Sequence, residues 1–561
     1  NSNFRREEIY GQFKVQVTPD DVFYFLGKWH DQDGGDNFRT YDNNPLAPGL
    51  KFSEDQEPGL LLGGWNHRWA PGSHTLFLGG RLSADQRLSD PSADQLLLER
   101  DSSAMRPGFV FTNRFGFDEY TDPALRDAVP PPVSLGPDFQ TLIYSPALLQ
   151  AIAPYIGTGD VTKTSTAPFS FDTKREFEIY TAELQHIFQT EGNTLLVGGR
   201  YQDGTIDTRT RLSVIRPTLT GGFSTPAAEQ KSHTDFERTS LYVYDYWNVN
   251  RCLTLIGGLS WDRIEHPDNF RNPPVNDGQR EDDKLSGKLG FTWSPSRLFT
   301  MRGAYTEGLG GMTFDESVRL EPVQLAGFNQ AYRTIISESI AGSVETPEYK
   351  IWGLSIEGAL PSRTWWGASF NHIEQDVDRT VGAFAGYDLG VFPISPAYFP
   401  SGTPQRLDYK EDSLALTLNQ LIGDEFSVGM GYRVTRSKLR SRFTEISRTL
   451  APGADVTDKA TLHELTLFGN WNAPSGLFAQ LEANYYHQDL DDDSNSLAAG
   501  RDGDDFWHFN AFAGYRFHRN LCEIGVGVLN IGNSDYQLSP LNPYGEIVRD
   551  RTAVLRCRFS F

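Results

Sequence analysis

The sequence lacks several features that would assign it to a common class of protein. No stretch holds the roughly 18 consecutive apolar residues of a transmembrane helix, which excludes a helical span. Its three cysteines, Cys252, Cys522 and Cys557, show no Cys-x-x-Cys spacing, which excludes a zinc ribbon, a c-type haem site and a disulfide scaffold. Lys and Arg number 51 against 73 Asp and Glu, and the net charge of -22 argues against nucleic acid as a partner.

Catalytic signatures are also missing. The chain contains no GxSxG, HExxH, P-loop or GxGxxG pattern, and its eleven histidines are scattered. We therefore expect that the protein is not an enzyme.

What the sequence does contain is alternation with a period of two residues. In the last eleven residues, one face of an extended strand is apolar and the other is polar or charged. The apolar face consists of Ala553, Leu555, Cys557, Phe559 and Phe561, and the polar face of Thr552, Arg556, Arg558 and Ser560. The same alternation recurs in 285–293, 426–434 and 477–486. It is typical of an outer-membrane β-barrel, in which only alternate residues need to be apolar, and Leu555, Phe559 and Phe561 would lie on its closing strand.

Very short turns alternate with long polar loops along the chain. Nine short turns join alternating segments: 18–20, 70–73, 190–193, 248–251, 294–297, 360–363, 423–425, 473–476 and 518–520. This asymmetry predicts an all-β fold over residues 1–561, a transmembrane antiparallel barrel in a bacterial outer membrane, with periplasmic short turns and extracellular long loops.

The turns also predict the number of strands. Nine hairpins and a final strand make about nineteen strands, and the first, near 7–17, would run inward from outside. Because bacterial barrels usually have an even number, we expect about 20 strands, with one upstream strand missing or hidden in 1–6.

The segment 90–174 is predicted as the longest loop, too large for a simple connection. It contains a candidate short helix at 145–154, with Ser145 as N-cap and Pro146 in the first turn. Two interpretations remain open. The loop either folds into the lumen and narrows it, or caps the barrel from outside.

Five charged residues on polar strand faces are predicted to face the lumen: Lys288, Arg433, Glu482, Arg556 and Arg558. Charged side chains that line a pore can set its ion selectivity. The alternative is that they pair with one another and only satisfy a polar wall.

Asp31, Asp33 and Asp36 are weak candidates for a calcium site, since carboxylate oxygens suit calcium but their spacing misses the EF-hand pattern. The alternative is a solvated loop tip, or divalent bridging to neighbouring lipopolysaccharide. No other cofactor is expected. Outer-membrane lipid and lipopolysaccharide are expected partners, and a periplasmic or surface protein is a further candidate.

Several segments resemble the barrel of TonB-dependent receptors. They are Ser240–Trp247 followed by Leu253–Asp262, Lys288–Pro295 followed by Met301–Tyr305, and the penultimate-strand motif Gly527–Tyr536. The resemblance covers 175–561. It implies a receptor-like transport barrel, but the plug domain and TonB box of that family have no counterpart in this chain. Glu178–Gln185 and Leu320–Gln330 also resemble large outer-membrane proteins in which such a barrel follows periplasmic tetratricopeptide repeats.

Three functions follow from this reading. The first is a polar passage for a solute or polymer that works without a plug in this chain. The second is a structural or docking barrel in an outer-membrane assembly, with its lumen occupied by a partner. The third is the barrel part of a TonB-coupled importer.

Overall fold

The computed structural model describes most of the chain. The described residues are 5–35, 51–101, 153–214, 228–311, 319–332, 334–337, 346–388, 396–491, 503–517, 521–545, 547–548 and 550–559.

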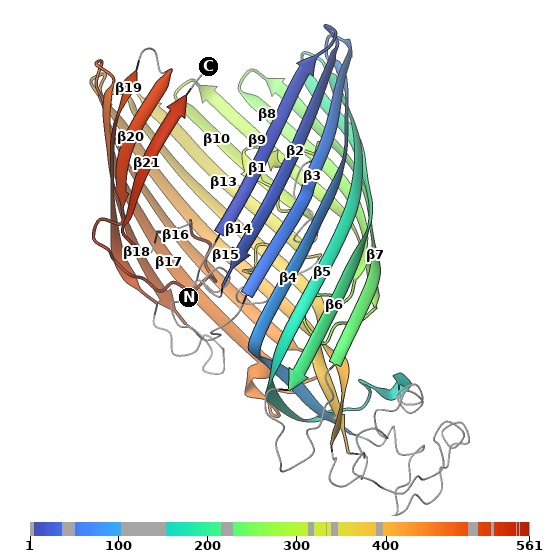
Figure 1. Cartoon of the computed structure of the whole chain (residues 1–561). Coiled ribbons are helices and arrows are strands. Elements are labelled where there is room, and N and C mark those ends of the chain that lie inside the picture. The colour runs from blue at the N-terminus through green and yellow to red at the C-terminus, as the bar shows by residue number, and fades with distance from the viewer. Residues whose placement is uncertain are drawn as a thin grey trace, which may run out of the picture.

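Nineteen strands form one continuous sheet that curves around a central axis, as Figure 1 shows. They are β1 (Arg5–Gln16), β2 (Asp21–Gly34), β3 (Lys51–Ala70), β4 (Ser73–Arg100), β5 (Val161–Gln189), β6 (Asn193–Val214), β7 (Ala228–Asn250), β8 (Leu253–Pro267), β9 (Gln279–Ser296), β10 (Phe299–Leu309), β13 (Glu348–Leu360), β14 (Thr364–Tyr387), β15 (Ala397–Ile422), β16 (Phe426–Phe443), β17 (Asp455–Asn472), β18 (Leu477–Leu490), β19 (Asp505–Phe517), β20 (Cys522–Leu529) and β21 (Thr552–Phe559). Two short strands, β11 (Gln324–Leu325) and β12 (Phe328–Asn329), make a separate hairpin, and η3 (Ala153–Tyr155) and η4 (Pro452–Ala454) are single 3-10 turns.

The predicted all-β transmembrane barrel of about 20 strands is confirmed. Strands that follow one another along the sheet pair antiparallel, and the short turns gather at one end of the barrel and the long connections at the other (Figure 1). β1 starts at the long-loop end and β21 finishes at the short-turn end, as predicted. Within the described ranges, no helix has the length and apolarity to cross a membrane.

β1 and β21 are the two ends of the sheet and flank a seam (Figure 1). β1 is exposed along all twelve residues, and β21 is exposed at seven of eight positions. Among the described residues, β1 pairs only with β2 and β21 only with β20. Because nineteen strands alternate in direction, β1 and β21 run the same way.

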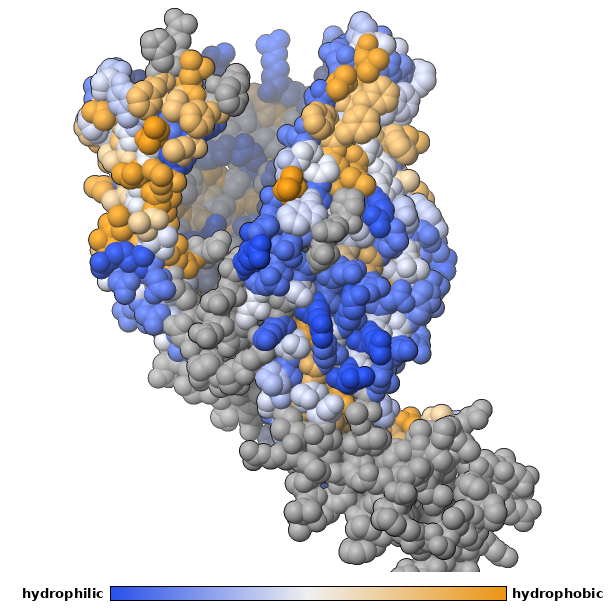
Figure 2. Space-filling model, in the orientation of Figure 1, coloured by the Kyte–Doolittle hydropathy of each residue, from blue (hydrophilic) through white to orange (hydrophobic). Residues whose placement is uncertain are grey.

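Along each long strand the outward residues change from apolar to charged, and β7 illustrates this. Near the short turn its outward positions are apolar except for Asp245, with Leu241 54% exposed and Trp247 48% exposed. Further along they are charged, at Lys231, Asp235 and Glu237. The stretch 240–250 matches the roughly 9 to 11 residues with which a tilted strand crosses the hydrocarbon core. The rest of the strand therefore projects beyond the membrane on the long-loop side, and Figure 2 shows the apolar band next to a hydrophilic one.

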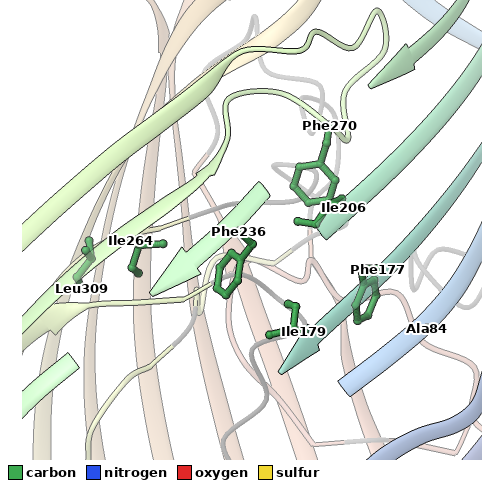
Figure 3. Close-up of a cluster of buried hydrophobic side chains, with 8 residues drawn as sticks. All are labelled: Ala84, Phe177, Ile179, Ile206, Phe236, Ile264, Phe270 and Leu309. Atoms are coloured by element: carbon green, nitrogen blue, oxygen red, sulfur yellow. The ribbon is translucent and has the colours of Figure 1, made fainter. Parts of the chain in front are cut away.

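The inner face of this projecting part combines apolar side chains with buried polar ones such as Thr208, Ser232 and Arg238. Strands β4 to β8 and β10, together with the β8–β9 connection, contribute buried side chains to one cluster (Figure 3). Its members are Ala84, Phe177, Ile179, Ile206, Phe236, Ile264, Phe270 and Leu309. The extramembrane part of the barrel thus has charges on its outer face and a buried apolar cluster among the side chains of its inner face.

The projecting ends of β4 and β14 meet although seven strands separate them along the sheet. Residues 96–99 of β4 pair in parallel with residues 383–386 of β14. Phe169 stacks on Phe384 with ring centroids 5.1 Å apart, and Arg100 binds Glu445 with an Nη2–Oε2 distance of 2.6 Å. This strand clamp draws the long-loop end of the barrel together on one side.

The strand clamp includes both flanks of the segment 90–174, which the sequence predicts to be a loop. Its two flanks, up to Arg100 and from Val161, are paired β-strand and extend the barrel wall. The middle of the range, 102–152, lies outside the described residues, and with it most of the predicted 145–154 helix. Whether that part narrows the lumen or caps the barrel stays a prediction.

Candidate functional site

The connection between β10 and β13 turns back into the barrel. We call its part 319–332 the re-entrant segment; it contains the β11–β12 hairpin. The hairpin rests on inward-facing glycines of the wall. A Cβ atom added to Gly353 would lie 2.3 Å from Cε1 of Phe328, and one added to Gly290 would lie 3.3 Å from Cβ of Ala326. Only glycine lets the hairpin come this close to the wall.

Glu183 of β5 holds the start of the re-entrant segment. Its Oε2 accepts a hydrogen bond from the backbone N of Leu320 at 2.8 Å, and its Oε1 accepts one from the backbone N of Glu321 at 3.0 Å. The hydroxyl of Tyr242 donates to the same Oε1 at 2.7 Å. Glu183 is 1% exposed, so its charge is compensated by these three donors instead of by water.

A second cluster holds the middle of the segment. The hydroxyl of Tyr244 donates to Oε1 of Glu321 at 2.7 Å. Nζ of Lys288 donates to Oε1 of Gln330 at 2.6 Å and lies 3.4 Å from Oε1 of Glu321. Thr306 also donates to Gln330, at 3.0 Å. Strands β5 to β10, which form one wall, and the re-entrant segment thus share one buried polar network.

Arg319 and Tyr332 bring the two ends of the segment together. The guanidinium of Arg319 lies 3.7 Å above the ring of Tyr332, a cation–π contact, and 3.8 Å from Oε2 of Glu321. Burial, and next the Glu321 carboxylate, raise the pKa of Tyr332 well above its usual value, so its hydroxyl stays protonated.

A second connection, between β20 and β21, covers the opposite wall. Nδ2 of Asn542 donates to the backbone oxygens of Thr435 and Ala460, each at 3.1 Å. The hydroxyl of Tyr409 donates to the backbone oxygen of Leu541 at 3.2 Å. These wall residues lie near the long-loop end of their strands, so this connection sits closer to the extracellular mouth than the β11–β12 hairpin.

The five predicted lumen-facing residues have different environments. Lys288 faces inward but is 2% exposed, because the re-entrant segment covers it. Arg433 is an inner-wall residue of β16 whose side chain is 57% exposed, 4.0 Å from Glu464. Glu482 of β18 accepts hydrogen bonds from Asn484 at 2.6 Å and Asn510 at 3.0 Å.

The last two lie on the closing strand. Arg556 places Nη2 3.3 Å from Oε1 of Glu523, with 53% of its side chain exposed, and Arg558 stands opposite Glu523 in the β20–β21 register. Leu555 and Phe559 lie on the exposed outer face of β21, and Phe561 lies outside the described residues.

The calcium candidates remain a prediction. Asp31 and Asp33 lie on β2, opposite Glu7 and Arg5 of β1, and Asp36 lies outside the described residues. In the part of the chain that the structure describes, no three His, Cys, Asp or Glu side chains are grouped to hold a metal ion.

Sequence reasoning missed Glu183, Glu321 and Gln330, which hold the re-entrant segment. One signal was present: Tyr242 and Tyr244 occupy consecutive inward positions of β7. Large tyrosines on an inner face need something to pack against, and here it is the re-entrant segment, since Tyr244 shares an apolar cluster with Leu325 and Phe328.

Comparison with known proteins identifies a family that shares this architecture. A family model described as "TonB dependent receptor-like, beta-barrel" matches residues 10–319. No curated protein sequence matches the chain. Solved structures share the fold at 12% identity. They include the copper transporter OprC (TM-score 0.53, covering 100% of this chain and 72% of that one) and the ferric citrate transporter FecA (0.53, 95% and 66%).

The ferripyoverdine receptor of the Pseudomonas aeruginosa outer membrane is a third such structure, with a TM-score of 0.51. The match covers 100% of this chain and 65% of that receptor. The chain thus spans about two thirds to three quarters of the length of these structures. These matched proteins are named as transporters and receptors. The chain belongs to the TonB-dependent receptor-like β-barrel family and is an outer-membrane transport barrel.

Proposed function

We propose that this barrel is a passage for a polar solute across the outer membrane, narrowed from within by the re-entrant segment. The observation that carries the proposal is the buried network of Glu183, Lys288, Glu321 and Gln330. It holds a chain segment inside the lumen at the level of the apolar band.

The two inner walls differ in a way that indicates the route. On β5 to β10 the inward charges are covered by the re-entrant segment, as Lys288 shows. On β16 to β21 the inward charges Arg433 and Arg556 keep about half of their side chains exposed. A solute that moves along the second wall meets the exposed guanidinium groups of Arg433 and Arg556, which fit a polar or anionic solute.

Ion selectivity tests this route. We expect the double substitution Arg433→Glu/Arg556→Glu to move the reversal potential of single channels in a salt gradient toward cation preference, because two exposed wall charges change sign. Single-channel recording in planar bilayers measures both the conductance and this shift.

The matched control is Arg209→Glu/Arg263→Glu, which makes the same charge change on the outer face of β6 and β8. It should leave the selectivity unchanged. An equal shift in both variants would contradict a route along β16 to β21, and a barrel that conducts no ions under any condition would contradict the passage itself.

A second candidate is uptake coupled to TonB, which the match to transporters and receptors of this fold favours. The two mechanisms differ in their energy requirement. Uptake of a labelled solute into cells should stop when an uncoupler collapses the proton gradient if the barrel is TonB-coupled, and should continue if it is a passive passage.

A further inference from the structure

The backbone ladder of the barrel wall is interrupted between β9 and β10. These two strands pair only as far as Thr306 and Lys288. Beyond that rung, on the long-loop side, β9 stays paired with β8, and β10 continues to Leu309 paired with β13. Among the described residues, the stretch 279–287 of β9 therefore has a ladder partner on one side only. We call this stretch the ladder break.

Side chains bridge the ladder break in place of a backbone ladder. Glu307 of β10 accepts a hydrogen bond from a backbone N of β9 at 3.1 Å, and Lys284 forms an ion pair with Glu348 at the start of β13. Further along β9, Oδ2 of Asp282 accepts a hydrogen bond at 2.9 Å from Oγ1 of Thr346, two residues before β13. The wall is thus held together here by a few side-chain contacts.

His266, near the end of β8, joins the last of these contacts. Its Nε2 lies 2.9 Å from Oδ2 of Asp282 and 3.1 Å from Oγ1 of Thr346. Its Nδ1 lies 2.9 Å from the backbone oxygen of Pro267. His266 is 2% exposed and Thr346 is 8% exposed. The end of β8, the beginning of β9 and the approach to β13 therefore meet at one buried imidazole ring.

The partners of the two ring nitrogens require a protonated ring. A carbonyl oxygen can only accept, so Nδ1 of His266 donates to Pro267. Burial raises the pKa of Asp282, but the hydrogen bond and the charge of His266 outweigh it and hold that pKa below its usual value, so the carboxylate is ionised. Nε2 therefore also donates. An imidazole that donates from both nitrogens carries a positive charge.

Thr346 is held in a strained backbone conformation by the same contacts. Its φ of 38° lies in the left-handed region, which β-branched residues rarely adopt. Such a conformation persists only where the surrounding structure imposes it. The hydroxyl contacts with His266 and Asp282 supply this constraint, so their loss lets Thr346 relax.

The other charged groups on the elements around His266 have partners of their own. Arg280 stands directly opposite it in the β8–β9 register; its Nη1 donates to the backbone oxygen of Asp378 at 2.8 Å, and its Nη2 lies 4.0 Å from Oδ1 of Asp282. Asp268, which follows β8, accepts hydrogen bonds from two other side chains. The next inward charges on β7 and β8 pair with one another; they are Arg238 and Asp262. Among the described residues, only Asp282 lies within ion-pair distance of His266.

This environment distinguishes His266 from the other histidines that lie beside carboxylates. Four of them keep 17% to 67% of their side chains exposed; they are His67, His233, His372 and His487. His30 is 6% exposed, but its nitrogens lie 3.6 Å from Glu8 and 3.8 Å from Glu54. Within the part of the chain that the structure describes, His266 alone combines a buried ring with close acceptors at both nitrogens.

We propose that His266, Asp282 and Thr346 form a proton-sensitive latch that holds the ladder break closed. While His266 is protonated, its charge ties β9 to the approach of β13. When the ring loses its proton, Nε2 presents a lone pair to Oδ2 of Asp282, the contact becomes repulsive, and Thr346 keeps at most one of its two partners. The latch lies beyond the apolar outward positions of β9, which end at Leu285, and is independent of the proposed passage.

Hydrogen exchange of the folded barrel in detergent micelles, followed by mass spectrometry, tests the latch. Histidines release their proton between about pH 5 and 8, so the latch should be closed at the acidic end of this range and open at the other. After correction for the intrinsic pH dependence of exchange, we expect the amides of 346–350 to exchange about tenfold faster at about pH 8 than at about pH 5.5.

Two substitutions of His266 separate the proton from the side chain. His266→Gln should remove the pH dependence and keep exchange slow, because the glutamine amide donates to Asp282 at either pH and does not titrate. His266→Ala removes the donor and should exchange fast at both pH values. Circular dichroism checks that each variant retains its strands.

The matched control is His233→Gln, which removes an exposed histidine whose Nδ1 lies 2.7 Å from Oδ1 of Asp207. This variant should keep the full pH dependence at 346–350. The proposal is overturned if the unmodified protein shows no pH-dependent exchange there, or if the dependence survives in His266→Gln. Slow exchange of His266→Ala at both pH values would overturn it as well.

Discussion

Asp262→Ala should lower the free energy of unfolding by about 3–5 kcal/mol, the usual cost of leaving one partner of a buried ion pair without the other. Arg238 is the partner: its Nη2 lies 2.8 Å from Oδ1 of Asp262, and the two side chains are 1% and 7% exposed. The hydroxyl of Ser240 donates to the same oxygen at 2.6 Å. Chemical denaturation in lipid vesicles measures the change.

Asp172→Ala provides the control. Its partner Arg87 lies on the outer face, and both side chains are largely exposed to solvent. Exposed pairs of this kind contribute about 0–1 kcal/mol, so this variant should unfold almost like the unmodified protein. If Asp262→Ala and Asp172→Ala lose equal amounts of unfolding free energy, burial of Arg238 does not determine the size of the loss.

Gly353→Leu should displace the β11–β12 hairpin and increase single-channel conductance. The new Cβ would lie 2.3 Å from Cε1 of Phe328, so the hairpin cannot stay packed against the barrel wall. Such overpacking destabilises the folded barrel by about 1–3 kcal/mol, and displacement of the hairpin relieves this steric strain. Conductance in planar bilayers, together with protease cleavage of the released segment, measures the effect.

Gly431→Leu adds the same side chain to an inward-facing glycine of β16. A Cβ there meets no atom within 4 Å, so nothing is displaced. This variant should conduct slightly less than the unmodified barrel, because the leucine occupies lumen space. If Gly353→Leu also conducts less, the hairpin does not narrow the passage.

The strand order and orientation could be predicted because they depend on local patterns. Outward apolar residues alternate with inward polar ones, and a slip by one residue would bury every charge in lipid. Eight of the nine predicted short turns join paired strands, and the ninth, 518–520, lies outside the described residues. The inward direction of Lys288, Arg433, Glu482, Arg556 and Arg558 follows from the same alternation.

The length of the strands beyond the membrane was less predictable. The beginning of 90–100 is polar, and 161–174 is polar on its outward face, and both resemble a loop when apolar alternation is the signal. They are strands because their inward face packs on a core that distant strands complete, as the contact of Phe169 with Phe384 shows.

The period-two pattern and the lengths of the connections determined that this chain is a transmembrane barrel, which face of each strand meets lipid, and which end of the barrel carries the long loops. These properties depend on a few neighbouring residues. Tertiary structure alone decided which inward charges remain exposed. Lys288 and Arg433 are equivalent in the pattern, yet one is buried under the re-entrant segment and the other is open to the lumen. The difference comes from contacts between Lys288 and residues 33 and 42 positions further along the chain, which no local pattern encodes.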